Sequence, residues 1–190
     1  HRRLRCRFLL VGYDWRFGYR REGEVELAKE VGGELGFEVE TAEPYRKNSH
    51  VISSTLIRRL LSEGRLESAA EFLGRRYWVR REVVPGDGRG SLIGFPTANL
   101  GDTENLCLKE GVYAVLVEER YRGVANFGRR PTFGRRRRLL EVHIPGFKGD
   151  LRGRKIKVEF LRFLREERKF SGVEELREQI EKDIQSALAV

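Results

Sequence analysis

The chain has 190 residues, a formal net charge of +9, 39% hydrophobic residues and 35% charged residues. No apolar run approaches the ~20 residues that a membrane-spanning helix needs, and the apolar stretch after the basic start is too short for a signal peptide. Two distant cysteines, Cys6 and Cys107, fit neither a disulfide framework nor a zinc site, so we expect a soluble protein of the reducing cytoplasm, with one large domain or two small ones.

The sequence contains no methionine, even at position 1. We therefore expect the chain to be a fragment whose true N-terminus is missing. The positive charge allows polyanions, nucleotides or a nucleic acid as partners. Its sharpest basic run is Arg135–Arg138, and such runs are more often solvated loops than nucleic-acid sites.

The first 40 residues follow a strand–helix–strand pattern. Residues 8–12 form a short apolar run ending in glycine, which predicts a buried parallel strand. Residues 24–35 are apolar at helical spacing and are followed by Gly36, a helix stop, and residues 37–40 predict another strand. This order is typical of doubly wound α/β domains, which bind ligands at the carboxyl ends of their strands.

Residues 52–64 predict a second helix, ended by Gly64. Ser53 or Ser54 is expected as its N-cap, and the free N–H groups at that end, with Arg58 one turn on, are suited to a phosphate. The alternative is a capped helix that only packs against a sheet. Another short helix follows and ends at Gly74, where we place the domain boundary.

A glycine-rich loop, Gly-Asp-Gly-Arg-Gly, spans residues 86–90. Its glycines, Gly86, Gly88 and Gly90, permit φ > 0 and close approach to a ligand, so successive N–H groups are expected to form an anion-binding concavity. Arg89 adds a planar charged group suited to phosphate oxygens. The alternative is an ordinary hairpin loop rich in glycine and proline.

Pro96 fixes the chain direction after this loop, and an extended backbone then places the Thr97 hydroxyl and the Asn99 amide on one face. Both supply oxygen ligands of the kind that Mg²⁺ accepts when nucleotide phosphates provide the rest. The sequence therefore predicts a magnesium site at Thr97 and Asn99.

From residue 77 the pattern changes to short strands separated by turn signals, at 78–85, 112–118, 121–127, 139–144 and 155–163. Evenly spaced strands without intervening helices predict a closed antiparallel barrel. A C-terminal helix follows: Ser171 and Glu174 have capping-box spacing. Its apolar stripe is expected to pack against the core and consists of Val173, Leu176, Ile180, Ile184 and Leu188.

The run Gly-Phe-Pro-Thr-Ala-Asn-Leu at 94–100, after the glycine-rich loop, resembles the signature of riboflavin kinase, specifically the kinase module of bacterial bifunctional FAD synthetases. The resemblance implies a Greek-key β-barrel with a C-terminal helix at 75–190. Residues 12–18 and 52–58 are similar to the second half of the family's FMN adenylyltransferase module. This implies a truncated, Rossmann-like α/β nucleotidyltransferase domain at 1–74, and an α+β protein as a whole.

The adenylyltransferase superfamily requires a Gly-x-x-His motif after its first strand, and this chain has none. We therefore expect this chain not to adenylate FMN, whereas the intact parent protein is expected to make FAD as well.

Glu141 is the expected catalytic base, because the family's catalytic glutamate falls at this position of its Glu-Val-His segment. We expect its carboxylate to point inward, toward a site for Mg²⁺ and substrate, since a buried glutamate without a partner is costly. The alternative is a glutamate on the outer face of the barrel, paired with nearby arginines. His143 shares the parity of Glu141 and is interpreted as structural.

The resemblance implies ATP contacts at Ser53, Ser54, Thr55 and Arg58, and contacts near flavin and nucleotide at Asn126, Arg130, Thr132 and Phe133. Phe170 resembles the family's isoalloxazine-pocket segment, although a barrel plug is an equal alternative.

The implied reaction is riboflavin + ATP → FMN + ADP with Mg²⁺, with small molecules as partners, neither nucleic acid nor membrane, and an undetermined oligomeric state. Two alternatives stay open: a non-catalytic flavin- or nucleotide-binding protein, and a basic nucleic-acid-binding barrel.

Overall fold

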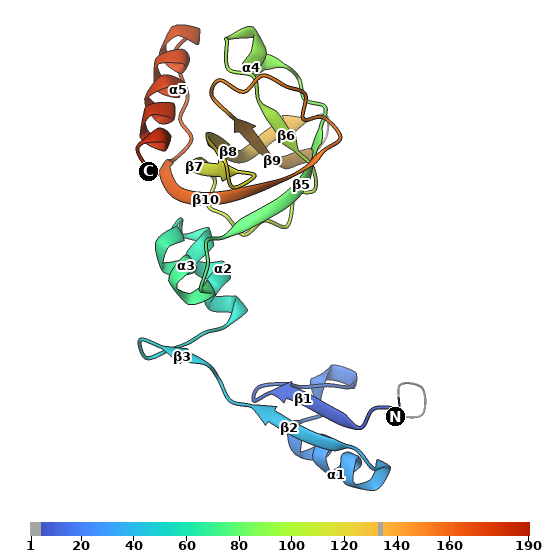
Figure 1. The fold of residues 1–190 in the computed structure, drawn as a ribbon. Helices are drawn as coiled ribbons and strands as arrows, with labels where there is room; N and C mark the ends of the chain where they lie inside the picture. The colour runs from blue at the N-terminus through green and yellow to red at the C-terminus, as the bar shows by residue number, and fades with distance from the viewer. Residues whose placement is uncertain (1–4, 133–134) are drawn as a thin grey trace. The chain divides into compact units, whose positions relative to one another are not determined.

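The computed structural model describes residues 5–132 and 135–190, except for the side chains of residues 130–137. The chain divides into two compact units, residues 1–52 and residues 53–190, coloured blue to cyan and cyan to red in Figure 1. Of the helices in these described ranges, none has both the length and the apolar character needed to cross a bilayer.

The first unit confirms the expected strand–helix–strand order. β1 (Phe8–Gly12) pairs in parallel with β2 (Glu38–Ala42), and α1 (Val25–Leu35) connects them and ends at Gly36 in the left-handed region, with φ of 74°. A short 3-10 turn, η1 (Tyr19–Arg21), follows β1, and β3 (Arg46–Lys47) pairs with β4 (His50–Val51).

The expectation that β1 is buried was wrong. Its side chains Phe8 and Leu10 are 48% and 58% exposed. Within the described residues β1 pairs with β2 alone. A two-stranded sheet buries little apolar surface, so part of β1 stays exposed. The first unit thus presents apolar surface at these positions.

The second unit is a closed barrel of six antiparallel strands in the order β10-β5-β6-β9-β8-β7, which confirms the predicted architecture. The strands are β5 (Trp78–Val84), β6 (Ala98–Leu100), β7 (Gly111–Val117), β8 (Tyr121–Thr132), β9 (Arg135–His143) and β10 (Lys155–Arg165). β6 returns to lie beside β9, across the β7–β8–β9 meander, as in a Greek key.

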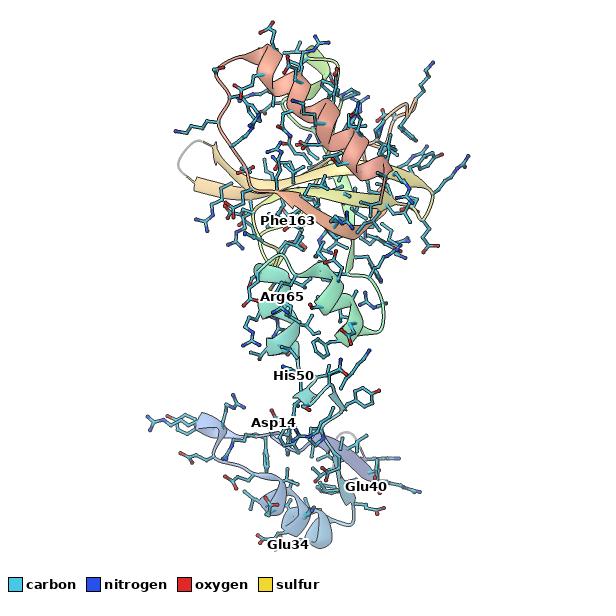
Figure 2. The ribbon with its side chains drawn as sticks, turned by 90° about the vertical axis from the view of Figure 1, so that its left-hand side faces the viewer. Asp14, Glu34, Glu40, His50, Arg65 and Phe163 are labelled. Carbon is cyan, nitrogen blue, oxygen red and sulfur yellow. The ribbon has the colours of Figure 1, made fainter. Side chains whose placement is uncertain are left out.

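Alternate residues of the strands fill the barrel with apolar side chains, among them Leu100, Phe127, Leu140 and Phe160, each at most 1% exposed. Two helices, α2 (Ser54–Ser62) and α3 (Leu66–Leu73), add buried leucines to this same core. The turn between these helices meets β10, since a Cβ at Gly64 would lie 3.4 Å from the Phe163 ring. Figure 2 labels Phe163 and Arg65, which belongs to the same turn. In the structure these helices group with the barrel, in the unit of residues 53–190. The domain boundary predicted at residue 74 is not tested by this grouping and stays a prediction.

α5 (Val173–Leu188) covers the outside of β7, β8 and β10, where Ile184 and Ala187 pack in a second apolar cluster. The expected stripe is only partly right, since Val173 and Leu188 at the helix ends are 49% and 52% exposed.

The expected capping box was also wrong. Gly172 is the N-cap of α5 and makes no side-chain hydrogen bond. The N–H and hydroxyl of Ser171 instead donate to the Glu175 carboxylate, each at 2.9 Å, because the helix begins one residue later than a Ser171 cap requires.

Candidate active site

A cavity of about 1080 Å³ lies on the outer face of the barrel. Its floor is formed by residues of all six barrel strands, and its walls by a short helix, α4 (Arg89–Leu92), by α5, and by residues 166–172, which we call the strap. Figure 1 shows α4 at the end of the barrel opposite α2 and α3. The cavity brings together eight of the residues predicted for the site: Gly86, Arg89, Gly90, Thr97, Asn99, Asn126, Glu141 and Phe170.

Three polar side chains form a row across the cavity floor. Glu141 of β9 pairs with Asn99 of β6 on one side and with Asn126 of β8 on the other. Residues directly opposite on neighbouring strands have their Cβ atoms about 5 Å apart and share one face of the sheet. The two amides therefore flank the carboxylate.

Glu141 does not point into the barrel, which corrects our expectation. Its sequence neighbours, Leu140 and Val142, fill the barrel interior and are at most 1% exposed, so the alternation of a strand turns Glu141 to the outer face. That face is covered by α5 and the strap, so the carboxylate lines a cavity and not an open surface. The alternation along β9 correctly predicted that Glu141 and its neighbours lie on opposite faces of the strand. It did not show which face is the barrel interior, or that α5 and the strap cover the outer face.

The Oδ1 atom of Asn126 is buried and has no hydrogen-bond partner within the residues that the structure describes. A buried acceptor without a partner costs about 1–3 kcal/mol, so its persistence in a native protein calls for an explanation. Here the atom lies beside Glu141 at a cavity, where a bound ligand with a donor group or a cation would satisfy it.

The glycine-rich loop leads directly into a helical turn. Gly88 has φ of 69° and precedes α4, and the N–H of Ser91 donates to its carbonyl at 3.0 Å. Gly86 is needed for close approach, because a Cβ there would lie 2.0 Å from the Asn99 amide nitrogen. A Cβ at Gly90 would lie 2.3 Å from the Phe95 carbonyl oxygen. The glycine at position 86 therefore leaves room for the Asn99 side chain, a role that the composition of the loop did not reveal.

His143, interpreted from sequence as structural, also lines the cavity. Its Nδ1 lies 2.8 Å from the carbonyl oxygen of Pro96, and since a carbonyl only accepts, Nδ1 carries the proton. The ring also meets Phe95 edge-on, with centroids 5.6 Å apart. His143 thus fixes the segment that leads into Thr97.

β10 and α5 contribute cavity residues that sequence reasoning missed, namely Arg165 of β10 and Leu176, Ile180 and Asp183 of α5. The signal available was the 3.6-residue period of α5, which we assigned to core packing alone. The alternative of Phe170 as a barrel plug is wrong, because Phe170 lies in the strap and lines the cavity.

Two hydrogen bonds hold the strap to α5 through Glu175. The Ser171 backbone N–H and then its hydroxyl lower the pKa of the Glu175 carboxyl, with a smaller contribution from Arg168, whose guanidinium lies 3.3 Å away. The charged carboxylate therefore stabilises the junction of strap and helix.

Of the remaining predicted residues, those whose side chains the structure describes do not line this cavity. Ser53 is the N-cap of α2, as one of the two expected, and its hydroxyl accepts from the Leu56 N–H at 3.2 Å. Arg58 lines a separate, shallow hollow of about 530 Å³. Ser54 and Thr55 lie in the first turn of α2 and do not line the cavity either. Phe133 and the side chains of Arg130 and Thr132 lie outside the described residues.

Residues 73–190 match the family model described as riboflavin kinase. The chain belongs to the riboflavin kinase family. Residues 1–56 match a second model, described as FAD synthetase. The matched kinase segment contains the whole barrel, the strap and α5, and so every residue that lines the large cavity.

Curated relatives agree with this family assignment. The chain is 38% identical over 190 residues to the bifunctional riboflavin kinase/FMN adenylyltransferase of Buchnera aphidicola subsp. Schizaphis graminum, covering 96% of this chain and 61% of the relative. It is 40% identical over 184 residues to the Escherichia coli protein of the same name, covering 95% of this chain and 59% of the relative. The chain thus spans about three fifths of the length of these relatives.

A crystal structure of a macrolide-efflux protein from Streptococcus pneumoniae also resembles this chain, with a TM-score of 0.77 and 31% identity. The similarity covers 96% of this chain and 60% of that protein.

Proposed function

We propose that the large cavity transfers the γ-phosphoryl group of ATP to the ribityl 5′-hydroxyl of riboflavin, giving FMN and ADP. The observation that carries this proposal is the row Asn99–Glu141–Asn126 on the cavity floor, within the segment that matches riboflavin kinase. Phosphoryl transfer needs a positioned hydroxyl, neutralised phosphate charge and an acceptor for the hydroxyl proton, and this cavity provides residues suited to each.

Glu141 is the proposed base. The hydroxyl oxygen forms a bond to the γ-phosphorus, the bond from that phosphorus to the β,γ-bridging oxygen breaks, and the electron pair leaves with ADP. The hydroxyl proton passes to the Glu141 carboxylate, while the Asn126 Oδ1 beside it is free to accept a hydrogen bond from the substrate.

Thr97, Asn99 and the buried Asn126 Oδ1 suit Mg²⁺, because they offer hard oxygen atoms at one cavity. In the described ranges no three His, Cys, Asp or Glu side chains cluster to form a protein-only metal site, so phosphate oxygens would supply the remaining ligands. When bound, the ion supplies charge neutralisation on the phosphates. We propose Thr97 and Asn99 as the residues that hold it.

The other cavity walls divide by chemistry. Arg89 of the glycine-rich loop lines the cavity, where its guanidinium is suited to phosphate oxygens. Phe170 of the strap, with Val112, Leu176 and Ile180, forms an apolar wall suited to the flat isoalloxazine ring. We therefore place the nucleotide near α4 and the flavin near α5.

For a full-length parent we propose FMN adenylation to FAD as a second activity, because residues 1–56 match the FAD synthetase model. From this chain we expect FMN alone, since it lacks a Gly-x-x-His motif. Cys6 and Cys107 are free thiols, which suits a reducing compartment, and we propose the cytoplasm.

The test is turnover of riboflavin by this chain with ATP, with and without Mg²⁺, resolving riboflavin, FMN and FAD by chromatography. FMN that forms only with the divalent ion supports the proposal. Riboflavin binding without any FMN would replace the kinase by a non-catalytic flavin-binding protein. Formation of FAD would contradict the expectation drawn from the missing motif.

A further inference from the structure

A buried ion pair joins the end of β10, directly before the strap, to α5. The Asp183 carboxylate of α5 is 5% exposed and accepts from the Nε of Arg165 at 3.0 and 3.1 Å and from its Nη2 at 2.7 Å. Gln179 donates to the same carboxylate at 2.8 Å, and the Nη1 of Arg165 donates to the Glu166 carbonyl oxygen at 3.0 Å. Each guanidinium nitrogen thus already donates within the protein.

This pair lies next to Phe170, the aromatic side chain of the strap. The Arg165 guanidinium carbon lies 5.8 Å from the centre of the Phe170 ring, and that of Arg168 lies 4.8 Å from it. A cation this close to an aromatic face attracts it and so favours one ring orientation. The ion pair therefore acts on the ring that lines the apolar wall of the cavity.

The strand register places Arg165 at the far end of the floor from the phosphates. Arg165 pairs with Val112, which pairs with Asn126, so Arg165 continues the row through Asn126 and Glu141. Neighbouring strands are about 4.8 Å apart, which puts the Arg165 backbone about 10 Å from that of Asn126. At that distance the pair is removed from the reacting hydroxyl but adjacent to the proposed flavin wall.

Stability alone does not explain a buried ion pair at this position. The desolvation of both charges offsets most of their attraction, and apolar residues of similar volume are often as stabilising. An apolar pair would lack directional contacts. It could neither donate a hydrogen bond to the Glu166 carbonyl oxygen nor place a cation beside the Phe170 ring.

We propose that Asp183 and Arg165 are positioning residues that set the affinity for riboflavin by holding Phe170 and the strap closed over the flavin. This inference rests on the proposed function. The pair acts through Phe170 and the strap backbone, and neither residue takes part in the chemistry.

The experiment compares Asp183→Asn with the double variant Arg165→Met/Asp183→Leu, in which an apolar pair replaces the ion pair. Arg162→Met is the matched control, because Arg162 lies on the same strand and pairs with Glu67 at 4.0 Å on the surface. The readouts are KM for riboflavin and for ATP, thermal stability, and hydrogen exchange of strap amides in the ligand-free chain.

We expect both variants to raise KM for riboflavin about tenfold and to leave KM for ATP within about twofold. The double variant should recover the thermal stability that Asp183→Asn loses, and both should exchange strap amides faster than the wild type. A double variant with wild-type KM for riboflavin, or with wild-type strap exchange, would overturn the proposal.

If the double variant fails to fold, a double-mutant cycle of Asp183→Asn and Phe170→Ala still tests the proposal. If Asp183 acts through Phe170, Asp183→Asn should not raise KM for riboflavin further in the Phe170→Ala background. Additive effects would refute that route. If the wild type makes no FMN, the proposed function fails, and hydrogen exchange in the strap still decides whether the ion pair positions it.

Discussion

Replacing Glu141 by glutamine tests the proposed base most directly. The register centres its side chain between Asn99 and Asn126, and glutamine keeps the size and one acceptor oxygen of glutamate while losing the ability to take a proton. Substrate positioning should therefore survive, and the loss should appear in the chemical step.

The expected magnitude follows from this separation. General base catalysis contributes about 10²- to 10⁴-fold to a rate, which is about 3–5 kcal/mol of transition-state stabilisation. We expect kcat to fall by at least about 100-fold, KM for riboflavin to stay within about threefold, and the free energy of unfolding to change by no more than about 1 kcal/mol.

The assay is steady-state FMN formation at saturating Mg²⁺ and ATP, with riboflavin varied and thermal unfolding measured alongside. Glu82→Gln is the matched control, since Glu82 is an exposed carboxylate on β5, two residues before the cavity-lining Val84. A Glu141→Gln variant with kcat within threefold of wild type would refute the assignment of the base, and an equal loss in Glu82→Gln would show a non-specific effect.

Three further predictions follow from the same geometry. Gly86→Ala would place a methyl group 2.0 Å from the Asn99 amide nitrogen, so we expect the amide to move and kcat/KM for ATP to fall about tenfold or more. His143→Leu removes the donor to the Pro96 carbonyl and should lower kcat/KM about tenfold, whereas His143→Asn, which can place an amide N–H near the position of Nδ1, should retain more activity. The pKa of Glu175 is lowered from 4.5, so its stabilisation is present above that value and is lost as the pH falls through the lower folded pKa; Glu175→Gln should flatten this acid-side loss of thermal stability.

Each of these predictions has a control in the same chain. Gly33→Ala meets nothing within 4 Å and lies inside α1, so it should leave kcat/KM unchanged. Equal activity of the His143→Leu and His143→Asn variants would contradict a positioning hydrogen bond. For Glu175 the control is Glu181→Gln, since Glu181 is an exposed residue of the same helix. If the two variants lose thermal stability with falling pH in the same way, the proposed contribution of Glu175 to the junction of strap and helix is refuted.

Local patterns determined much of this fold from the sequence. Alternation and turn signals predicted five of the six barrel strands, and the 3.6-residue period predicted α1, α2 and α5, because these signals depend on neighbours in the chain. The strand that was missed, β6, has three residues, too few for an alternating pattern to be distinguished from a loop. Thr97, Asn99 and Glu141 were also singled out from sequence, through local motifs and the resemblance that they carry.

Only the tertiary structure decided which face of each barrel strand lines the cavity, and which residues distant in the sequence meet there. The alternation around Glu141 is the same whether its carboxylate points into the barrel or out of it. The packing of Leu140 and Val142 inside the barrel turns the carboxylate outward, and α5 and the strap make that outer face a cavity. The row from Asn99 to Arg165 joins strands far apart in sequence, and the Arg165–Asp183 pair joins a strand to a helix 18 residues later. Such contacts depend on strand register and helix packing, which no local pattern encodes, so the sequence identified the chemical groups and the closed barrel decided how they meet.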